Sequence, residues 1–242
     1  TYTEPELSRD HTERWLQHAG AAIIRSDMRT ALVPPVTLTA FEYDVPGDIS
    51  TAAFFCVAAS VIGSSRVVIK DVLVNPTRLG ALELLRRMGA HIQVSDSRLC
   101  ANEPVGSLMI ESSQLRGTDS DGIATASFID EVPALAVAAI FASGTTRFRK
   151  VGELRVKESD RAQGIVDLAR AFNCEATIEG EDLIVHGGAP QPSTSADPRG
   201  DHRLAMAIEI ATLALGGELG NRYQEMIAIS APEFYTTLRR LC

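Results

Sequence analysis

Two apolar stretches decide the fold: residues 48–62 (DISTAAFFCVAASVI) and residues 129–143 (IDEVPALAVAAIFAS). Each is rich in alanine and other apolar residues on every side of a helix, which predicts a helix buried in a core. The same order of elements follows both stretches: a strand, a helix with one apolar face, and two short strands. The two blocks are offset by about 80 positions, and such a repeat predicts a fold built from copies of one unit.

The repeat can be followed outward along the chain from these two helices. After the first we expect a strand at 65–74, a helix at 77–88 that ends at Gly89, and strands at 90–94 and 108–111; after the second, a strand at 145–151, a helix at 159–172, and strands at 175–178 and 182–186. A third, clipped copy is predicted as a helix at 202–215, a strand at 226–230 and a helix at 232–241.

The residues before the first repeat predict a smaller unit. A helix is expected from Ser8, as its N-cap, to the stop at Gly20, followed by strands at 21–25 and 37–43. Turn residues at 45–47 (VPG) mark the boundary. We therefore expect an incomplete unit at residues 1–46 and a larger domain at residues 47–242.

Composition excludes several classes of protein. The 242 residues include 23 Lys and Arg against 31 Asp and Glu, a formal charge of −8, which argues against a nucleic-acid binder. The apolar stretches fall well short of the ~20 residues that cross a bilayer. No targeting segment is visible at the start, so we expect a cytoplasmic protein with no membrane partner.

The sequence also argues against several kinds of cofactor site. The four cysteines lie far apart with no CxxC pair, which favours reduced thiols over a disulfide framework or a zinc site. There is no glycine-rich phosphate loop, and the histidines lack metal-ligand spacing. We therefore expect no nucleotide cofactor and no metal. Ser8, Asp10 and His11 lie on one turn and cannot form a nucleophile triad.

The most reactive-looking cluster is residues 155–161 (RVKESDR), where a loop leads into a helix. Lys157 and Arg161 flank Glu158, so cations that can hold anionic oxygens lie beside a carboxylate that can move protons. The alternative is a solvated first turn with ordinary ion pairs, and the heptad alone does not choose between them.

Charged residues of the same kinds occur at other helix starts. Arg203 follows Asp201 at the start of the third buried helix, Asp130 lies at the start of the second, and Arg9 comes just before the N-terminal helix. Plainer interpretations exist, with the two acids as helix caps and Arg203 as a surface charge. Equivalent positions of a repeat bring helix N-termini toward one face, however, so we expect a shared site for polyanions there.

Seven stretches taken together resemble the 5-enolpyruvylshikimate-3-phosphate (EPSP) synthase family. They are TEPELSRDHTERWL, VPGDISTAAFF, NPTRLGALELLRRMGA, FIDEVPALAVAAIFASGTT, LRVKESDR, GDHRLAMA and SAPEF, and they run from Thr3 to Phe234. The resemblance implies an α/β fold, the enolpyruvyl transferase inverted α/β barrel built from repeated βαβαββ units with helices inside. Residues 47–242 would form most of one domain, and residues 1–46 the last unit of its partner domain.

The resemblance also implies a reaction. The family transfers the enolpyruvyl group of phosphoenolpyruvate to the 5-hydroxyl of shikimate 3-phosphate and releases phosphate, a step of the shikimate pathway to chorismate and the aromatic amino acids and the target of glyphosate. By similarity, Asp130 would take the 5-hydroxyl proton and Glu158 would relay a proton at C3 of phosphoenolpyruvate. The implied substrate-binding residues are Arg9 and Lys157 for shikimate 3-phosphate and Arg161 and Arg203 for the phosphoenolpyruvate carboxylate.

The sequence begins with Thr1 rather than Met and lacks the family's amino-terminal portion. We therefore expect a processed, cleaved or truncated polypeptide that is inactive alone and needs the missing amino-terminal half as its partner. Two alternatives remain: a non-catalytic anion-binding or assembly module of the same fold, and the sister enzyme that acts on UDP-N-acetylglucosamine. The sister enzyme would not be expected to carry SRDHTE or VKESDR together with DHR.

Overall fold

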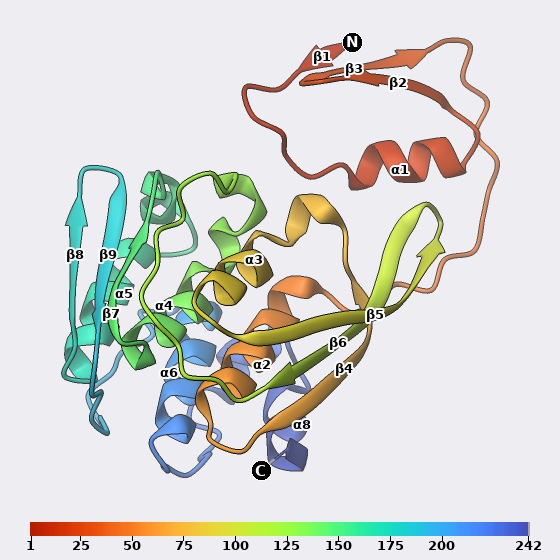
Figure 1. The fold of residues 1–242 in the computed structure, drawn as a ribbon. Coiled ribbons are helices and arrows are strands. Elements are labelled where there is room, and N and C mark those ends of the chain that lie inside the picture. The colour runs from red at the N-terminus through yellow and green to blue at the C-terminus, as the bar shows by residue number, and fades with distance from the viewer. Residues whose placement is uncertain (242) are drawn as a thin grey trace.

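Three antiparallel sheets organise the protein, which a computed structural model describes over residues 1–241. Their strand orders are β1-β3-β2, β4-β6-β5 and β7-β9-β8, and each sheet comes from one segment of chain (Figure 1). The strands are β1 Tyr2–Thr3, β2 Ala22–Ser26, β3 Arg29–Val33, β4 Arg66–Leu73, β5 His91–Cys100, β6 Glu103–Glu111, β7 Gly144–Phe148, β8 Glu175–Glu179 and β9 Asp182–Gly187. The helices are α1 His11–His18, α2 Ile49–Val61, α3 Gly80–Arg87, α4 Val132–Phe141, α5 Arg161–Ala171, α6 His202–Ala214, α7 Gln224–Ala228 and α8 Phe234–Leu241.

Helices α2, α4 and α6 form the centre of the core. They pack against one another, and most of their side chains are buried. A helix that is apolar on all sides is stable only where the rest of the protein surrounds it. The alanine-rich stretches therefore lie in the core. The two larger sheets flank these helices (Figure 1). This arrangement, with helices inside and sheets outside, confirms the expected inverted α/β barrel.

The two full repeats are confirmed. Parallel bridges pair Gly47 with Val72 and Asp119 with Arg147, and thereby supply a short first strand to each unit. After this strand, each unit continues with an inner helix, a strand, an amphipathic helix and a two-stranded hairpin. The first hairpin is longer than predicted, because β5 continues beyond residue 94 and β6 begins before residue 108.

The third copy departs from the prediction. No strand occurs between residues 188 and 241, and the expected strand at 226–230 is wrong. Helix α7 occupies this segment and buries Ile227 against the core. A short apolar run fits one turn of helix as well as it fits a strand, so periodicity could not separate the two.

The N-terminal segment also differs in detail from the prediction. The expected strand at 37–43 is absent; Phe41 and Tyr43 pack instead on His18 and Trp15 of α1. Their alternating pattern comes from contact with a helix rather than from a sheet. Ser8 is not the N-cap of α1, since Asp10 holds that position and turns its carboxylate elsewhere.

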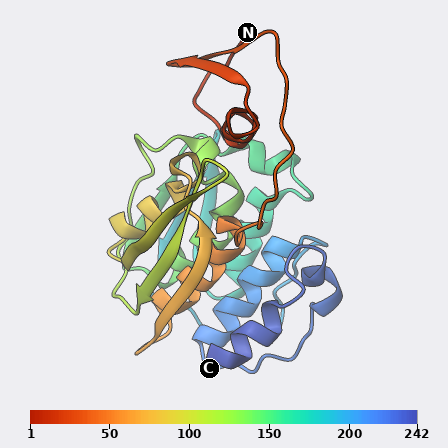
Figure 2. The ribbon, with the colours of Figure 1, turned by 90° about the vertical axis from the view of Figure 1, so that its right-hand side faces the viewer.

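Residues 1–33 form a small sheet with α1 on one side, above the rest of the molecule in Figures 1 and 2. Residues 34–46 then descend without regular secondary structure to the bridge at Gly47. The division at residue 46 stays a prediction, although the change from sheet to extended chain lies next to it.

Two further predictions concern the whole chain. Within residues 1–241, every helix falls short of the length and hydrophobicity that a membrane span requires. Cys56, Cys100 and Cys174 are free thiols in the structure. Cys242, the fourth predicted thiol, lies outside the described residues.

Candidate functional site

The N-terminal ends of the three inner helices meet on one face. Asp48 accepts a hydrogen bond from the Thr51 N–H (3.3 Å) and so caps α2. Asp201 accepts one from the Arg203 N–H (2.8 Å) and caps α6. The Arg203 guanidinium in turn donates to the backbone carbonyl oxygen of Asp130, just before α4 (2.8 Å). At the start of α2, the Ser50 hydroxyl donates to the carboxylate of Glu131, the residue just before α4, so the predicted convergence of the three helix starts is confirmed.

Asp130 lies at the centre of this face. It belongs to the 3-10 turn Ile129–Glu131 and does not cap α4, so the plainer interpretation of this acid is wrong. Its carboxylate instead accepts a hydrogen bond from Arg9. Lys157 Nζ lies 3.4 Å from Asp130 Oδ1, and Arg161 Nη1 lies 3.8 Å from the same oxygen.

These cations determine the charge of Asp130. Burial alone would raise the pKa of its carboxyl group, but the hydrogen bond from Arg9 and the charges of Arg203 and Lys157 outweigh burial and lower the pKa to about 2. Asp130 is therefore ionised at neutral pH. It can accept hydrogen bonds from hydroxyl groups, and it becomes a stronger base only when a ligand draws the cations away.

Arg161 forms a buried ion pair with Asp201, another acid of this face. Its side chain is 1% exposed, and Nε donates to Asp201 Oδ2 at 2.7 Å. Burial would raise the pKa of Asp201, but the hydrogen bond and charge of Arg161 hold it below its usual range. Arg161 Nη2 also lies 2.6 Å from Glu158 Oε2. The buried pair fixes the starts of α5 and α6 relative to each other.

Glu158 and Lys157 are more accessible than the buried pair. The Glu158 side chain is 53% exposed, which leaves its carboxylate free to exchange Arg161 for another partner. Lys157 forms an ion pair with Glu153 as well as with Asp130. Lys157, Glu153 and Asp130 border an open hollow of about 240 Å³. It is lined by Ser8, Arg9, Ala126, Ile129, Asp130, Glu153 and Lys157.

All six residues singled out from the sequence lie in this one cluster: Arg9, Asp130, Lys157, Glu158, Arg161 and Arg203. Sequence reasoning missed the second role of Asp201, which is both a helix cap and the partner of Arg161. It also missed Glu153, which lies four residues before Lys157 and so could have been found from its spacing.

Around the hollow, the site combines the ionised Asp130 carboxylate, the more exposed Glu158 carboxylate and four cations. Such a set can bind a ligand with several anionic groups, and its two acids can exchange protons with that ligand. A model of the EPSP synthase (3-phosphoshikimate 1-carboxyvinyltransferase) family matches residues 1–238. The chain belongs to the EPSP synthase family.

Curated relatives within the EPSP synthase family support this placement. The 3-phosphoshikimate 1-carboxyvinyltransferases of a Synechocystis and a Synechococcus species are each 44% identical to the chain, over 240 and 241 residues. The alignments cover 98% and 99% of this chain and 54% of each relative. The chain thus spans about half the length of the curated relatives it matches.

Solved structures agree with the EPSP synthase fold. An EPSP synthase from Acinetobacter baumannii superposes with a TM-score of 0.87 at 35% identity, covering 99% of this chain and 56% of that one. The enolpyruvyl transferase NikO from Streptomyces tendae superposes with a TM-score of 0.67 at 18% identity, covering 99% and 54%. The second likeness shows the shared fold alone.

Proposed function

We propose that this chain supplies one half of the active site of a 3-phosphoshikimate 1-carboxyvinyltransferase. The observation that carries the proposal is the arrangement around Asp130, where two carboxylates of different exposure lie among four cations. An anion-binding module needs the cations, but it has no use for two acids placed to exchange protons. The substrates are shikimate 3-phosphate and phosphoenolpyruvate, which carry phosphate and carboxylate groups.

The reaction begins with addition of the substrate's 5-hydroxyl oxygen to C2 of phosphoenolpyruvate while C3 gains a proton. The resulting tetrahedral intermediate then loses phosphate from C2 and a proton from C3. Asp130 is assigned the hydroxyl proton. When Arg9 leaves it for the substrate phosphate, the pKa of Asp130 rises and the carboxylate becomes a better base. Glu158, at the exposed edge of the site, is assigned the proton at C3.

The cations divide between the two substrates. Arg9 and Lys157, which border the hollow, are assigned to shikimate 3-phosphate. Arg161 and Arg203 are assigned to the phosphoenolpyruvate carboxylate, because a guanidinium can hold both carboxylate oxygens. Arg161 Nε and Nη2 already donate to Asp201, so Nη1 is the group that would reach the substrate.

The other half of the site would come from the part of the family's chain that has no counterpart here. We test this by mixing the purified chain with the complementary part of the Synechocystis relative and following phosphate release from phosphoenolpyruvate. Release that depends on shikimate 3-phosphate is expected from the mixture and not from either part alone, because closure around both substrates is needed for turnover.

Variants that preserve side-chain size test whether this chain carries out the proton transfers. Asp130→Asn and Glu158→Gln keep the size of each side chain and remove its basicity, so we expect a loss of turnover of at least about 100-fold. Arg170→Ala, at an exposed position of α5, should have no effect. Calorimetric binding of shikimate 3-phosphate to the mixture without turnover would favour a non-catalytic module. Robust turnover by this chain alone would contradict the need for a second half.

A further inference from the structure

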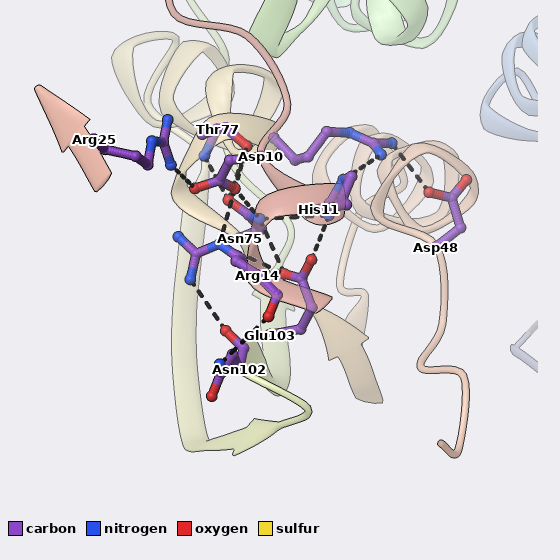
Figure 3. Close-up of polar contacts among 10 residues, drawn as sticks. Asp10, His11, Arg14, Arg25, Asp48, Asn75, Thr77, Asn102 and Glu103 are labelled. Atoms are coloured by element: carbon purple, nitrogen blue, oxygen red, sulfur yellow. Dashed lines mark hydrogen bonds and ion pairs between the residues drawn. The ribbon is translucent and has the colours of Figure 1, made fainter. Parts of the chain in front are cut away.

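A second set of buried charges lies outside the proposed site, where α1 meets the first repeat (Figure 3). Asn75 is fully buried, and its side-chain nitrogen donates to Asp10 Oδ1 (2.7 Å) and to Glu103 Oε2 (3.0 Å). Its oxygen accepts from the Thr77 N–H (2.9 Å), which fixes the orientation of the amide. One amide thus joins an acid of the N-terminal segment to an acid of the β5–β6 hairpin.

His11 makes a parallel connection. Its Nδ1 lies 2.6 Å from Glu103 Oε1, and its Nε2 lies 3.4 Å from Arg78 Nη1. Because a guanidinium can only donate, Nε2 is the acceptor, and Nδ1 carries the hydrogen that is donated to Glu103. Glu103 is 1% exposed, and its carboxylate accepts from two donors, one from each side of the junction.

Two cations also hold Asp10. Arg14 Nε donates to Oδ1 (2.8 Å) and Arg25 Nη1 donates to Oδ2 (2.7 Å). Asp10 is only 3% exposed, so these partners compensate a charge that burial would otherwise oppose. We refer to Asp10, His11, Asn75 and Glu103 as the clasp.

The clasp lies directly beside a residue of the proposed site. Arg9 precedes Asp10 in the chain, and its guanidinium reaches Asp130, 121 positions further on. The Arg9 side chain is 39% exposed. A long exposed side chain loses much entropy when it is held in one place, so its backbone must be fixed for the contact to persist.

We infer that the four clasp residues are positioning residues that hold Arg9 over Asp130. They touch no reacting group; they fix the start of α1 against the first repeat, and Arg9 then projects toward the second. The inference rests on the proposed function only for the use made of Arg9, because the position of Arg9 can be measured without substrate.

The test is a carboxyl ¹³C NMR titration of Asp130 in the full chain. Arg9 lowers the pKa of Asp130, so releasing Arg9 should raise this pKa from about 2 toward the ordinary range of an aspartate. We expect this shift in Asn75→Ala. His11→Ala, whose imidazole is partly exposed and whose loss the fold should tolerate, should give a smaller shift in the same direction. His11→Asn should reverse that shift, because its amide nitrogen can replace Nδ1 as donor to Glu103.

Two controls separate positioning from general damage. Ser113→Ala removes a hydrogen bond from the His91 N–H at the far end of the β5–β6 hairpin without touching the clasp, and should leave the pKa of Asp130 unchanged. In an Arg9→Ala background, Asn75→Ala should cause no further shift, since the clasp acts only through Arg9.

The inference is overturned if the pKa of Asp130 stays the same in folded His11→Ala and Asn75→Ala, or if Asn75→Ala shifts it equally without Arg9. Failure of the mixed halves to turn over substrate would contradict the proposed function and leave this titration result standing. The two ideas can therefore fail separately.

Discussion

At the scale of single residues, the buried pair of Arg161 and Asp201 has the clearest energetic consequence. Arg161→Ala would leave the fully buried Asp201 carboxylate without its cation. Removing one partner of a buried pair costs about 3–5 kcal/mol of unfolding free energy. Urea denaturation should show this loss. Arg170→Ala, which removes an exposed pair on the same helix, should change stability by less than about 0.5 kcal/mol. Equal effects of the two substitutions would contradict the account.

Asp10 predicts how stability depends on pH. Burial would raise its pKa, but hydrogen bonds from Arg14, Asn75 and Arg25 lower it to about 2. A group whose pKa is depressed on folding stabilises the fold above its unfolded pKa, near 4, and loses this contribution as pH falls toward 2. The difference corresponds to about 2 kcal/mol. Thermal unfolding between pH 5 and pH 2 should show this loss. In Asp10→Asn, stability should fall less steeply with pH, by a slope that corresponds to about one proton fewer taken up or released on unfolding.

At the scale of elements, one close approach of backbones holds the third sheet on the core. A Cβ added at Gly187, the last residue of β9, would lie 2.2 Å from the carbonyl oxygens of Ala139 and Ala142 at the end of α4. Backbone atoms cannot move aside, so Gly187→Ala should destabilise the protein by about 1–3 kcal/mol or more. Gly188→Ala, with open space around its Cβ, is the matched control. Chemical denaturation of both variants checks this, and equal midpoints would contradict it.

Elements with strong apolar patterns were predictable from the sequence. The stretches that became α2 and α4 are apolar on all sides and are therefore buried in the core, and Gly89 follows the end of α3 with a positive φ. A strand was wrongly predicted at 37–43, because the alternating apolar side chains of this segment contact α1 instead of a sheet. Part of the candidate site was predictable, because residues 155–161 place cations and a carboxylate next to one another in the sequence. The clasp was not predictable, because Asn75 and Glu103 are single polar residues that come together with Asp10 only in the tertiary structure.

At the scale of the whole molecule, exposed apolar side chains are concentrated in one region. Among the residues that the structure describes, 11 of 15 large exposed apolar side chains belong to residues 1–46. A concentration of exposed apolar side chains favours an interaction site in this region. If the proposed second half covers it, adding that half should lower the fluorescence of a bound hydrophobic dye. Unchanged dye fluorescence in a mixture that binds shikimate 3-phosphate would contradict this placement.

We propose that Asp130 and Glu158 of this chain carry out the proton transfers of an enolpyruvyl transfer. The most direct measurement is NMR of the product formed in D₂O by the chain mixed with the complementary half. Because C3 gains a proton from solvent-exchangeable groups and then loses one, the product's vinyl carbon should carry deuterium. Glu158→Gln should abolish this labelling together with product formation. No product from the mixture, or undiminished labelling with Glu158→Gln, would contradict the account.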